Sequence, residues 1–194
     1  LALFVSLTAF GLFSETVGAA PQLILGNSNY VKRVVFPLEV LPVARLLSNL
    51  VQTGFGFAIV LVALLVVRGG LPWTVLWLPV VLLPLCLLTL GCAFFLASLG
   101  VFVRDVGHVI GFAVTMPMFL SAVFYPVSSV PVDWQWAMNI NPLAVVVEEV
   151  RGVMLDGRSP DWAAFGLLTL TGGATLAAGL VWFMRSKNAF ADVL

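Results

Sequence analysis

Charged residues are scarce in this chain. Only 9% of its 194 residues are Asp, Glu, Lys or Arg, against about 25% in a typical soluble domain, while 61% are hydrophobic. The nine Lys and Arg residues balance the nine Asp and Glu residues, so no strongly basic or acidic surface points to nucleic acid. The composition therefore excludes an ordinary soluble domain and indicates an integral membrane protein.

Residues that build catalytic and metal sites are equally rare. His108 is the only histidine, so a multi-histidine metal site or a Ser–His catalytic arrangement has almost nothing to build on. Cys86 and Cys92 lie within an apolar stretch, where we expect small buried thiols rather than a disulfide or a metal site. The dipeptide Gly-Lys does not occur, which excludes a phosphate-binding P-loop. We therefore expect no catalytic site, no bound cofactor or metal and no ATPase activity in this chain.

Long apolar runs are what the sequence has instead, and a run of about 20 residues is enough to cross a membrane as a helix. Five such runs cover residues 1–20, 46–67, 79–100, 106–130 and 162–184. Pro117 predicts a kink in the fourth run, and Trp73 and Trp77 predict an interfacial anchor before the third. The alternation typical of membrane barrels is absent. We expect an all-α, polytopic protein in which residues 1–194 form one membrane domain.

Charge is missing from the middles of these runs, with Glu15 as the exception. Proton relays and ion-coupled carriers need ionisable residues within the membrane, so a secondary carrier is disfavoured. Energy for any transport is then expected to come from another chain.

Lys and Arg are distributed unequally between the two sides of this arrangement. One side carries six of them, namely Lys32, Arg33, Arg45, Arg104, Arg185 and Lys187, and the other carries Arg68, Arg151 and Arg158. Because basic residues accumulate on the cytoplasmic side, the first side, with the C-terminus, is predicted to be cytoplasmic.

The sequence "GNSNYVKRVVFP", residues 26–37, lies on that side between the first two runs. At helical periodicity one face collects Leu23, Ile24, Tyr30, Val31, Val34 and Val35, and the other collects Ser28, Asn29, Lys32 and Arg33. This pattern predicts an amphipathic helix at the membrane interface, which Pro37 ends. Periodicity alone leaves two interpretations open: a topology anchor or a docking element for a cytosolic partner.

A second amphipathic region, residues 127–162, lies on the external side. Asn141 is a candidate helix N-cap with Pro142 at the first position, and Gly157 is a candidate end. Leu143, Val146, Val147, Val150 and Met154 then share a face opposite Glu148 and Arg151, which are spaced for an i,i+3 ion pair. We expect short helices that dip into the outer leaflet; an ordinary external loop is the alternative.

Aromatic residues concentrate around the fourth run and this external region. Phe112, Phe119, Phe124, Trp134 and Trp136 are candidates to line a path for an amphipathic or sugar-like substrate, or else face lipid. Gly54 with Ala58 and Gly173 with Ala177 are spaced to permit close helix approach.

Several segments resemble permeases of the ATP-binding cassette type 2 (ABC-2) export group, in particular those for O-antigen, capsule or teichoic-acid chains. The segments are "ILGNSNYVKRVVFPLEVLPVARLLSNLV", "LGVFVRDVGHVI", "FLSAVFYPVSSVP", "INPLAVVVEEVRGVMLDG" and "FADVL", in that order. Members usually have six spans and an N-terminal amphipathic helix, whereas this chain starts with Leu1 in an apolar run without a basic signal-peptide region. We expect an N-terminally truncated permease with about five spans.

The resemblance implies a bacterial inner-membrane permease that pairs with a second copy and with two cytosolic ATPases, which bind ATP and Mg, and that moves a lipid-linked glycan. It places ATPase coupling in residues 22–37, at Asn27, Lys32, Arg33, Phe36 and Pro37. It places an external gate in residues 127–162 and just before them, at Tyr125, Pro126, Pro131, Asn141, Pro142, Glu148 and Arg151. A permease for drugs or lipids and a non-transporting membrane scaffold remain alternatives.

Overall fold

The computed structural model describes residues 1–27, 37–125 and 129–190, and the regular structure in these ranges is helical. Its α-helices are α1 (Ala2–Leu25), α3 (Val40–Arg68), α4 (Leu78–Phe102), α5 (Val106–Leu120), α6 (Val132–Ile140), α7 (Pro142–Arg151) and α8 (Trp162–Ser186). Three short turns complete them, which are η1 (Trp73–Trp77), the π-helical η3 (Gly152–Asp156) and η4 (Lys187–Ala189). The predicted all-α class is confirmed.

Four helices of the described chain, α1, α3, α4 and α8, are long and apolar enough to cross a membrane. They coincide with four of the five expected spans, and η1 supplies the interfacial turn expected at Trp73 and Trp77.

The prediction of a membrane span over residues 106–130 was wrong in length. There α5 has 15 residues and ends at Leu120, soon after Pro117, and Ala122 takes a positive φ of 53°. A helix of 15 residues spans only about 22 Å, less than the hydrocarbon thickness of about 30 Å.

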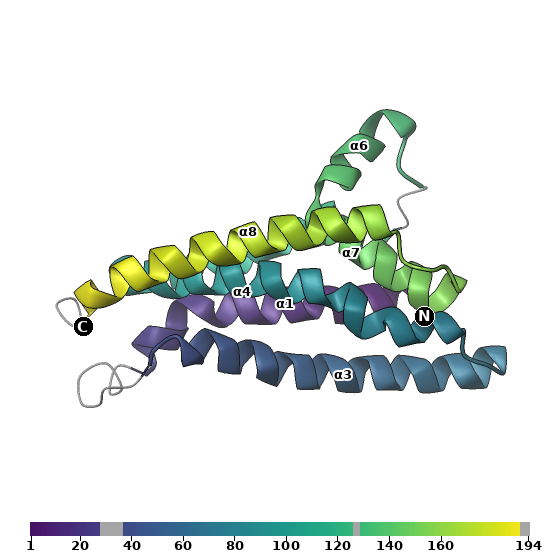
Figure 1. The fold of residues 1–194 in the computed structure, drawn as a ribbon, viewed down its shortest axis with the longest axis horizontal. Helices are drawn as coiled ribbons and strands as arrows, with labels where there is room; N and C mark the ends of the chain where they lie inside the picture. Colours follow the sequence, from purple (N-terminus) through teal and green to yellow (C-terminus); the bar gives the residue numbers. More distant parts are fainter. Residues whose placement is uncertain (28–36, 126–128, 191–194) are drawn as a thin grey trace.

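The long helices lie side by side in an elongated bundle (Figure 1). In it α1 and α4 pack against each other, α8 packs on α4, and α3 packs on α1. The short helix α7 packs against α1 and α4, whereas α6 projects away from the bundle (Figure 1). Thus α1 and α4 form the centre, and the other elements are arranged around them.

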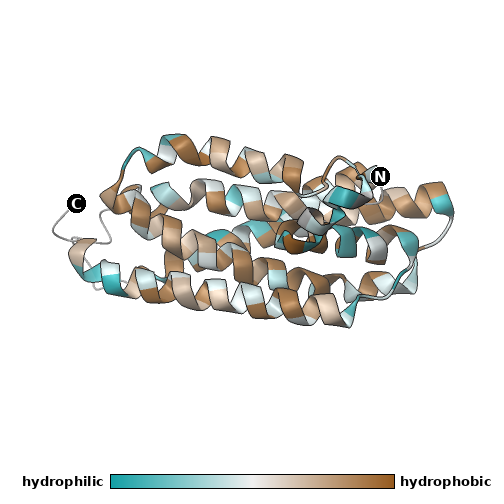
Figure 2. Cartoon of the chain, turned by 90° about the horizontal axis from the view of Figure 1, so that it is seen from above, coloured by the Kyte–Doolittle hydropathy of each residue, from teal (hydrophilic) through white to brown (hydrophobic). Residues whose placement is uncertain are grey.

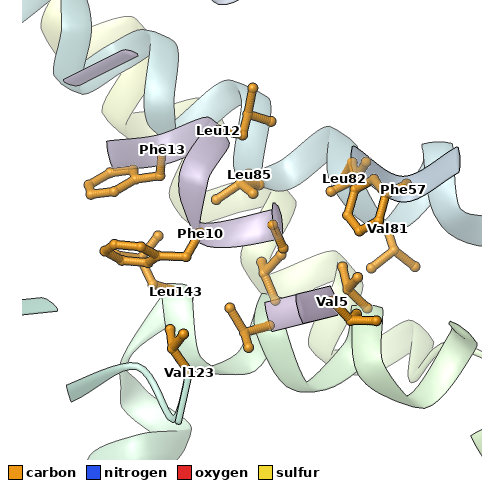
Figure 3. Close-up of a cluster of buried hydrophobic side chains, with 14 of the residues drawn as sticks. Val5, Phe10, Leu12, Phe13, Phe57, Val81, Leu82, Leu85, Val123 and Leu143 are labelled. Carbon is orange, nitrogen blue, oxygen red and sulfur yellow. The ribbon is translucent and has the colours of Figure 1, made fainter. Parts of the chain in front are cut away.

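The main core joins the long helices to the hairpin formed by α6, α7 and η3. Figure 3 shows Phe10 of α1, Leu85 of α4 and Phe57 of α3 in one buried cluster that also takes in Leu143 of α7. The apolar face predicted for α7 is confirmed, because Leu143, Val146, Val147, Val150 and Met154 are all buried. The hairpin is therefore anchored to the bundle and is more than a surface loop.

Glycines set the distance between α4 and α8. A Cβ atom at Gly179 would overlap the backbone of Gly91, and a Cβ at Gly91 would overlap the backbone at Thr175. The two glycines that sequence spacing favoured behave differently, since a Cβ at Gly54 or Gly173 meets nothing within 4 Å. Neither glycine is therefore a close contact between helices of this chain, because i,i+4 spacing does not reveal which face of a helix meets its neighbour.

The two ends of the bundle differ in their charges: among the described residues, basic ones outnumber acidic ones at one end, and acidic ones outnumber basic ones at the other. The ends of α1, α4 and α8 and the starts of α3 and α5 gather at one end, on the left in Figure 1, which we call the basic end. The other end carries η1, α6, α7 and η3, and we call it the hairpin end. Figure 2 shows hydrophobic residues along the long helices, with the strongly hydrophilic ones mainly toward the ends. This distribution fits a bundle that crosses a membrane end to end.

Replacing Gly179 by Ala should separate α4 from α8, because the added methyl meets backbone that has little room to move. We expect a loss of about 1–3 kcal/mol in the free energy of unfolding, the usual cost of overpacking. Gly173→Ala on the same helix is the matched control, and it should be neutral or gain up to about 1 kcal/mol from helix propensity. Unfolding in detergent micelles, followed by circular dichroism, measures both. Equal stabilities of the two variants would contradict this packing.

Candidate functional site

The hairpin end holds backbone that is not helical, and Asn141 ties it together. Its side-chain Oδ1 accepts a hydrogen bond from the backbone N–H of Leu143 at 3.0 Å, which caps α7 as predicted, with Pro142 at the first helical position. Its Nδ2 donates to the backbone oxygen of Leu120 at 3.1 Å and to Ser121 Oγ at 3.2 Å. One amide therefore joins the end of α5 to the start of α7.

Arg151 holds the same irregular segment from the other side. Its Nη2 donates to the backbone oxygens of Ala122 and Val123 at 3.1 and 3.4 Å, and to Ser6 Oγ of α1 at 2.6 Å. Its Nη1 lies 3.1 Å from Glu148 Oε2, the expected i,i+3 pair. The sequence prediction placed Arg151 on the polar face opposite the core, and this was wrong, since the residue is only 7% exposed. The long side chain reaches back into the protein because the carbonyls after α5 need a donor.

The π-helical turn η3 also has backbone carbonyls that need donors, and side chains from other parts of the chain supply them. Widening a helix to i→i+5 bonding leaves backbone groups to be satisfied by other parts of the chain. The hydroxyl of Thr74 donates to the backbone oxygen of Val153 at 2.7 Å, and the Arg68 guanidinium donates to that of Leu155. Gly157 then ends the turn at a φ of 65°, as predicted for a C-terminal glycine.

Glu149 is the second buried charge at this end, with 8% exposure. It accepts hydrogen bonds from Arg158 Nη2 and from the backbone N–H of Asp161, both at 3.0 Å. It thereby fixes the start of α8 against α7. Beside it lies a hollow of about 360 Å³, whose charged lining is Glu148, Glu149, Arg158 and Asp161. Among the described residues no group of His, Cys, Asp and Glu is arranged to hold a metal ion.

The remaining gate candidates lie in the same region. Tyr125 donates its hydroxyl to the backbone oxygen of Phe119 at 2.8 Å, and Pro131 precedes α6 as its N-cap. Pro126 lies outside the described residues. Sequence reasoning missed Ser6, Thr74 and Glu149, which are brought to the site by tertiary packing. For Thr74 and Glu149 a signal existed, because each is a polar residue next to apolar ones at a predicted interface.

The candidate channel-lining aromatics lie on the surface of this chain. Phe112, Phe119, Phe124, Trp134 and Trp136 are all exposed, and Phe119 stacks on Phe124 with ring centroids 5.4 Å apart. They belong to α5, to the segment after it and to α6. None of them lines the hollow beside Glu149. Any path they line would therefore lie between this surface and lipid or another chain.

Of the coupling candidates, Asn27 and Pro37 lie at the basic end. Lys32, Arg33 and Phe36 lie outside the described residues. Asn27 follows α1 and donates from Nδ2 to the backbone oxygen of Leu23 at 2.8 Å, whereas Pro37 begins the turn into α3. The expectation that Leu23 and Ile24 belong to a separate interfacial helix was wrong, because both lie in the last turn of α1. Apolar residues at the end of a span cannot be distinguished by periodicity from the start of an interfacial helix.

Glu39, two residues after Pro37, pairs with Lys187 after α8, with Nζ 2.5 Å from Oε1. Burial alone would raise the pKa of Glu39, but the hydrogen bond and positive charge of Lys187 outweigh it and hold the pKa below its usual value. The carboxylate is therefore ionised at neutral pH, and the pair ties α3 to α8.

Arg151→Leu should destabilise the hairpin end, because it removes the donor for the Ala122 and Val123 carbonyls and breaks a buried charged network. We expect a loss of about 3 kcal/mol in the free energy of unfolding. Arg104→Leu is the matched control, since Arg104 is exposed, and it should change stability by less than about 0.5 kcal/mol. Unfolding of both variants in detergent micelles gives the comparison. A loss no larger than the control's would show that Arg151 does not hold this segment.

Comparison with known proteins identifies the family. Residues 1–155 match the family model described as ABC-2 type transporter. Two relatives are each called O-antigen export system permease protein RfbA. One, from Klebsiella pneumoniae, is 27% identical over 177 residues, which make up 88% of this chain and 66% of that protein. The other, from Myxococcus xanthus, is 26% identical over 192 residues, which make up 98% of this chain and 74% of that protein.

The chain thus spans just under two thirds of the length of the Klebsiella relative. The family match covers most of this chain, because residues 1–155 include α1, α3, α4, α5, α6 and α7. With 155 of its 194 residues in that match, the chain belongs to the ABC-2 type transporter family.

Proposed function

We propose that this chain is the membrane permease subunit of an ATP-driven exporter that moves polysaccharide of the O-antigen, capsule or teichoic-acid type. The observation that carries the proposal is the family match together with relatives that are named O-antigen export permeases. The bundle of long apolar helices suits a permease, and the lack of a Gly-Lys phosphate loop leaves ATP hydrolysis to another subunit.

The proposed assembly contains two copies of the permease and two cytosolic ATPases, which hold the ATP and Mg. The exposed apolar faces of α3 and α5, with Phe55 and Phe112 among their most exposed side chains, offer surface for lipid and for the second copy. We place the assembly in the bacterial cytoplasmic membrane with the basic end, including Arg104, Arg185 and Lys187, in the cytoplasm. The lipid-linked glycan would pass between copies, where the exposed aromatic residues lie.

In the proposed mechanism the ATPases press on the residues from Asn27 to Pro37 when they close on ATP. The bundle carries this movement to the hairpin end, where the hydrogen bonds of Arg151 hold the break after α5 to α1 and α7. The hydrogen bonds of Arg151 would form in one arrangement of the hairpin end and be replaced by others in a second arrangement. Switching between these two discrete states would open and close the external path. This gives the buried arginine a role in transport in addition to its role in stability.

The test is copurification of the tagged permease with its ATPase subunit from membranes. Replacing Lys32, Phe36 and Pro37 by Ala should reduce the recovered ATPase by about tenfold or more, which corresponds to losing a contact worth about 1.4 kcal/mol or more. Asp156→Asn is the matched control, because Asp156 is an exposed residue of the hairpin end. It should leave recovery unchanged.

A second measurement tests the substrate. The host's own permease gene is deleted, this permease is expressed in its place, and the amount of O-antigen-type glycan on the cell surface is measured. Wild type should restore the glycan and the triple variant should not. A wild-type permease that recovers no ATPase contradicts the proposed exporter and favours a membrane scaffold. Recovery of ATPase without any restored glycan favours a permease for drugs or lipids.

A further inference from the structure

At the basic end, one residue on each side of residues 28–36 is buried in the same cluster. Ile24 precedes the segment at the end of α1 and is 0% exposed, and Leu38 follows it and is 5% exposed. Both belong to a cluster with Val101 near the end of α4 and with Phe183 near the end of α8. The two ends of the segment are therefore held in the same place by residues of the bundle.

Phe190, just after η4, completes this cluster with no exposed surface. Its ring lies 5.8 Å from that of Phe102 and 5.6 Å from that of Phe183, and Phe183 in turn lies 5.3 Å from Phe94. Aromatic pairs in such tilted or edge-to-face arrangements contribute beyond their buried area. The short turn after α8 is thus packed against the bundle by a row of aromatic rings.

The Glu39–Lys187 pair adds a polar tie at the same place. Glu39 is the N-cap residue of α3, yet its side chain makes no capping hydrogen bond and instead accepts one from Lys187 at the start of η4. α3 and α8 lie on opposite sides of the α1–α4 pair (Figure 1), so this contact joins the two outer helices across the basic end. It fixes the direction in which the chain enters α3.

We infer that the residues from Lys187 to Phe190 are positioning residues for ATPase coupling, because they lock both flanks of residues 28–36 to the ends of α4 and α8. The inference rests on the proposed function. It means that a push on this segment moves α4 and α8 together with α1 and α3, rather than α3 alone. The tight glycine packing of α4 on α8 would carry that push along the bundle as one body.

The test compares charge reversals of the pair in the full permease–ATPase complex, reconstituted in vesicles of phosphatidylethanolamine and phosphatidylglycerol with ATP as the probe. Lys187→Glu and Glu39→Lys should each leave the ATPase bound but reduce the permease's effect on the ATP hydrolysis rate by about fivefold, the factor that corresponds to a pair worth about 1 kcal/mol. The double reversal should restore it. Arg185→Glu is the matched control, with the same charge change at an exposed residue two positions away.

A purely structural pair would instead lower the unfolding temperature of the permease and leave the hydrolysis rate of each assembled complex unchanged, which would overturn the inference. Single reversals that behave like Arg185→Glu would overturn it as well. Where a reversal lowers the amount of permease in the membrane, Lys187→Gln serves in its place, since it removes the positive charge without adding a negative one. A wild-type permease that binds no ATPase contradicts the proposed function itself. If the wild type couples normally but Arg185→Glu loses coupling as much as the variants of the pair do, only this inference is contradicted.

Discussion

The rest of the structure depends on one constraint, which is that backbone N–H and C=O groups in a membrane have to be satisfied by the protein itself. Along the long helices the helical hydrogen bonds meet this requirement. It becomes a problem after Leu120, where α5 ends early, and in the π-helical turn after Arg151. At each place side chains supply the missing donors, with the buried Arg151 after α5 and the buried Thr74 at the π-helical turn.

This constraint explains why a chain with so little charge keeps buried charges at its hairpin end. Arg151 carries several N–H donors in one planar group, so one residue serves carbonyls of two successive residues, a hydroxyl of α1 and a carboxylate of α7. Lysine presents a single point charge and would not span the same set. The cost of burying the charge is offset by the number of its partners, and Ser6 joins α1 to this network.

Local features of the site could be predicted from the sequence, and tertiary ones could not. Asn141, Pro142 and Gly157 act on their own helix, so their roles follow from residue type and spacing. The burial of Arg151 depends on where α5 ends, and no local sequence pattern predicts that position. The contact of Gly91 with Gly179 likewise depends on how α4 and α8 are rotated against each other. For residues 28–36 the predicted amphipathic helix remains a prediction.

The four long spans were predictable because hydrophobic length is a strong signal, and their arrangement shows how the two ends are connected. α1 contributes Ser6 to the Arg151 network and Ile24 to the cluster at the basic end. These residues are 18 positions apart on one helix, a distance of about 27 Å along its axis. At its basic end α1 is pressed against α4, since a Cβ at Gly100 would overlap the backbone of Pro21. Through α1, the apolar cluster at the basic end and the polar network around Arg151 at the hairpin end are therefore built on one helix.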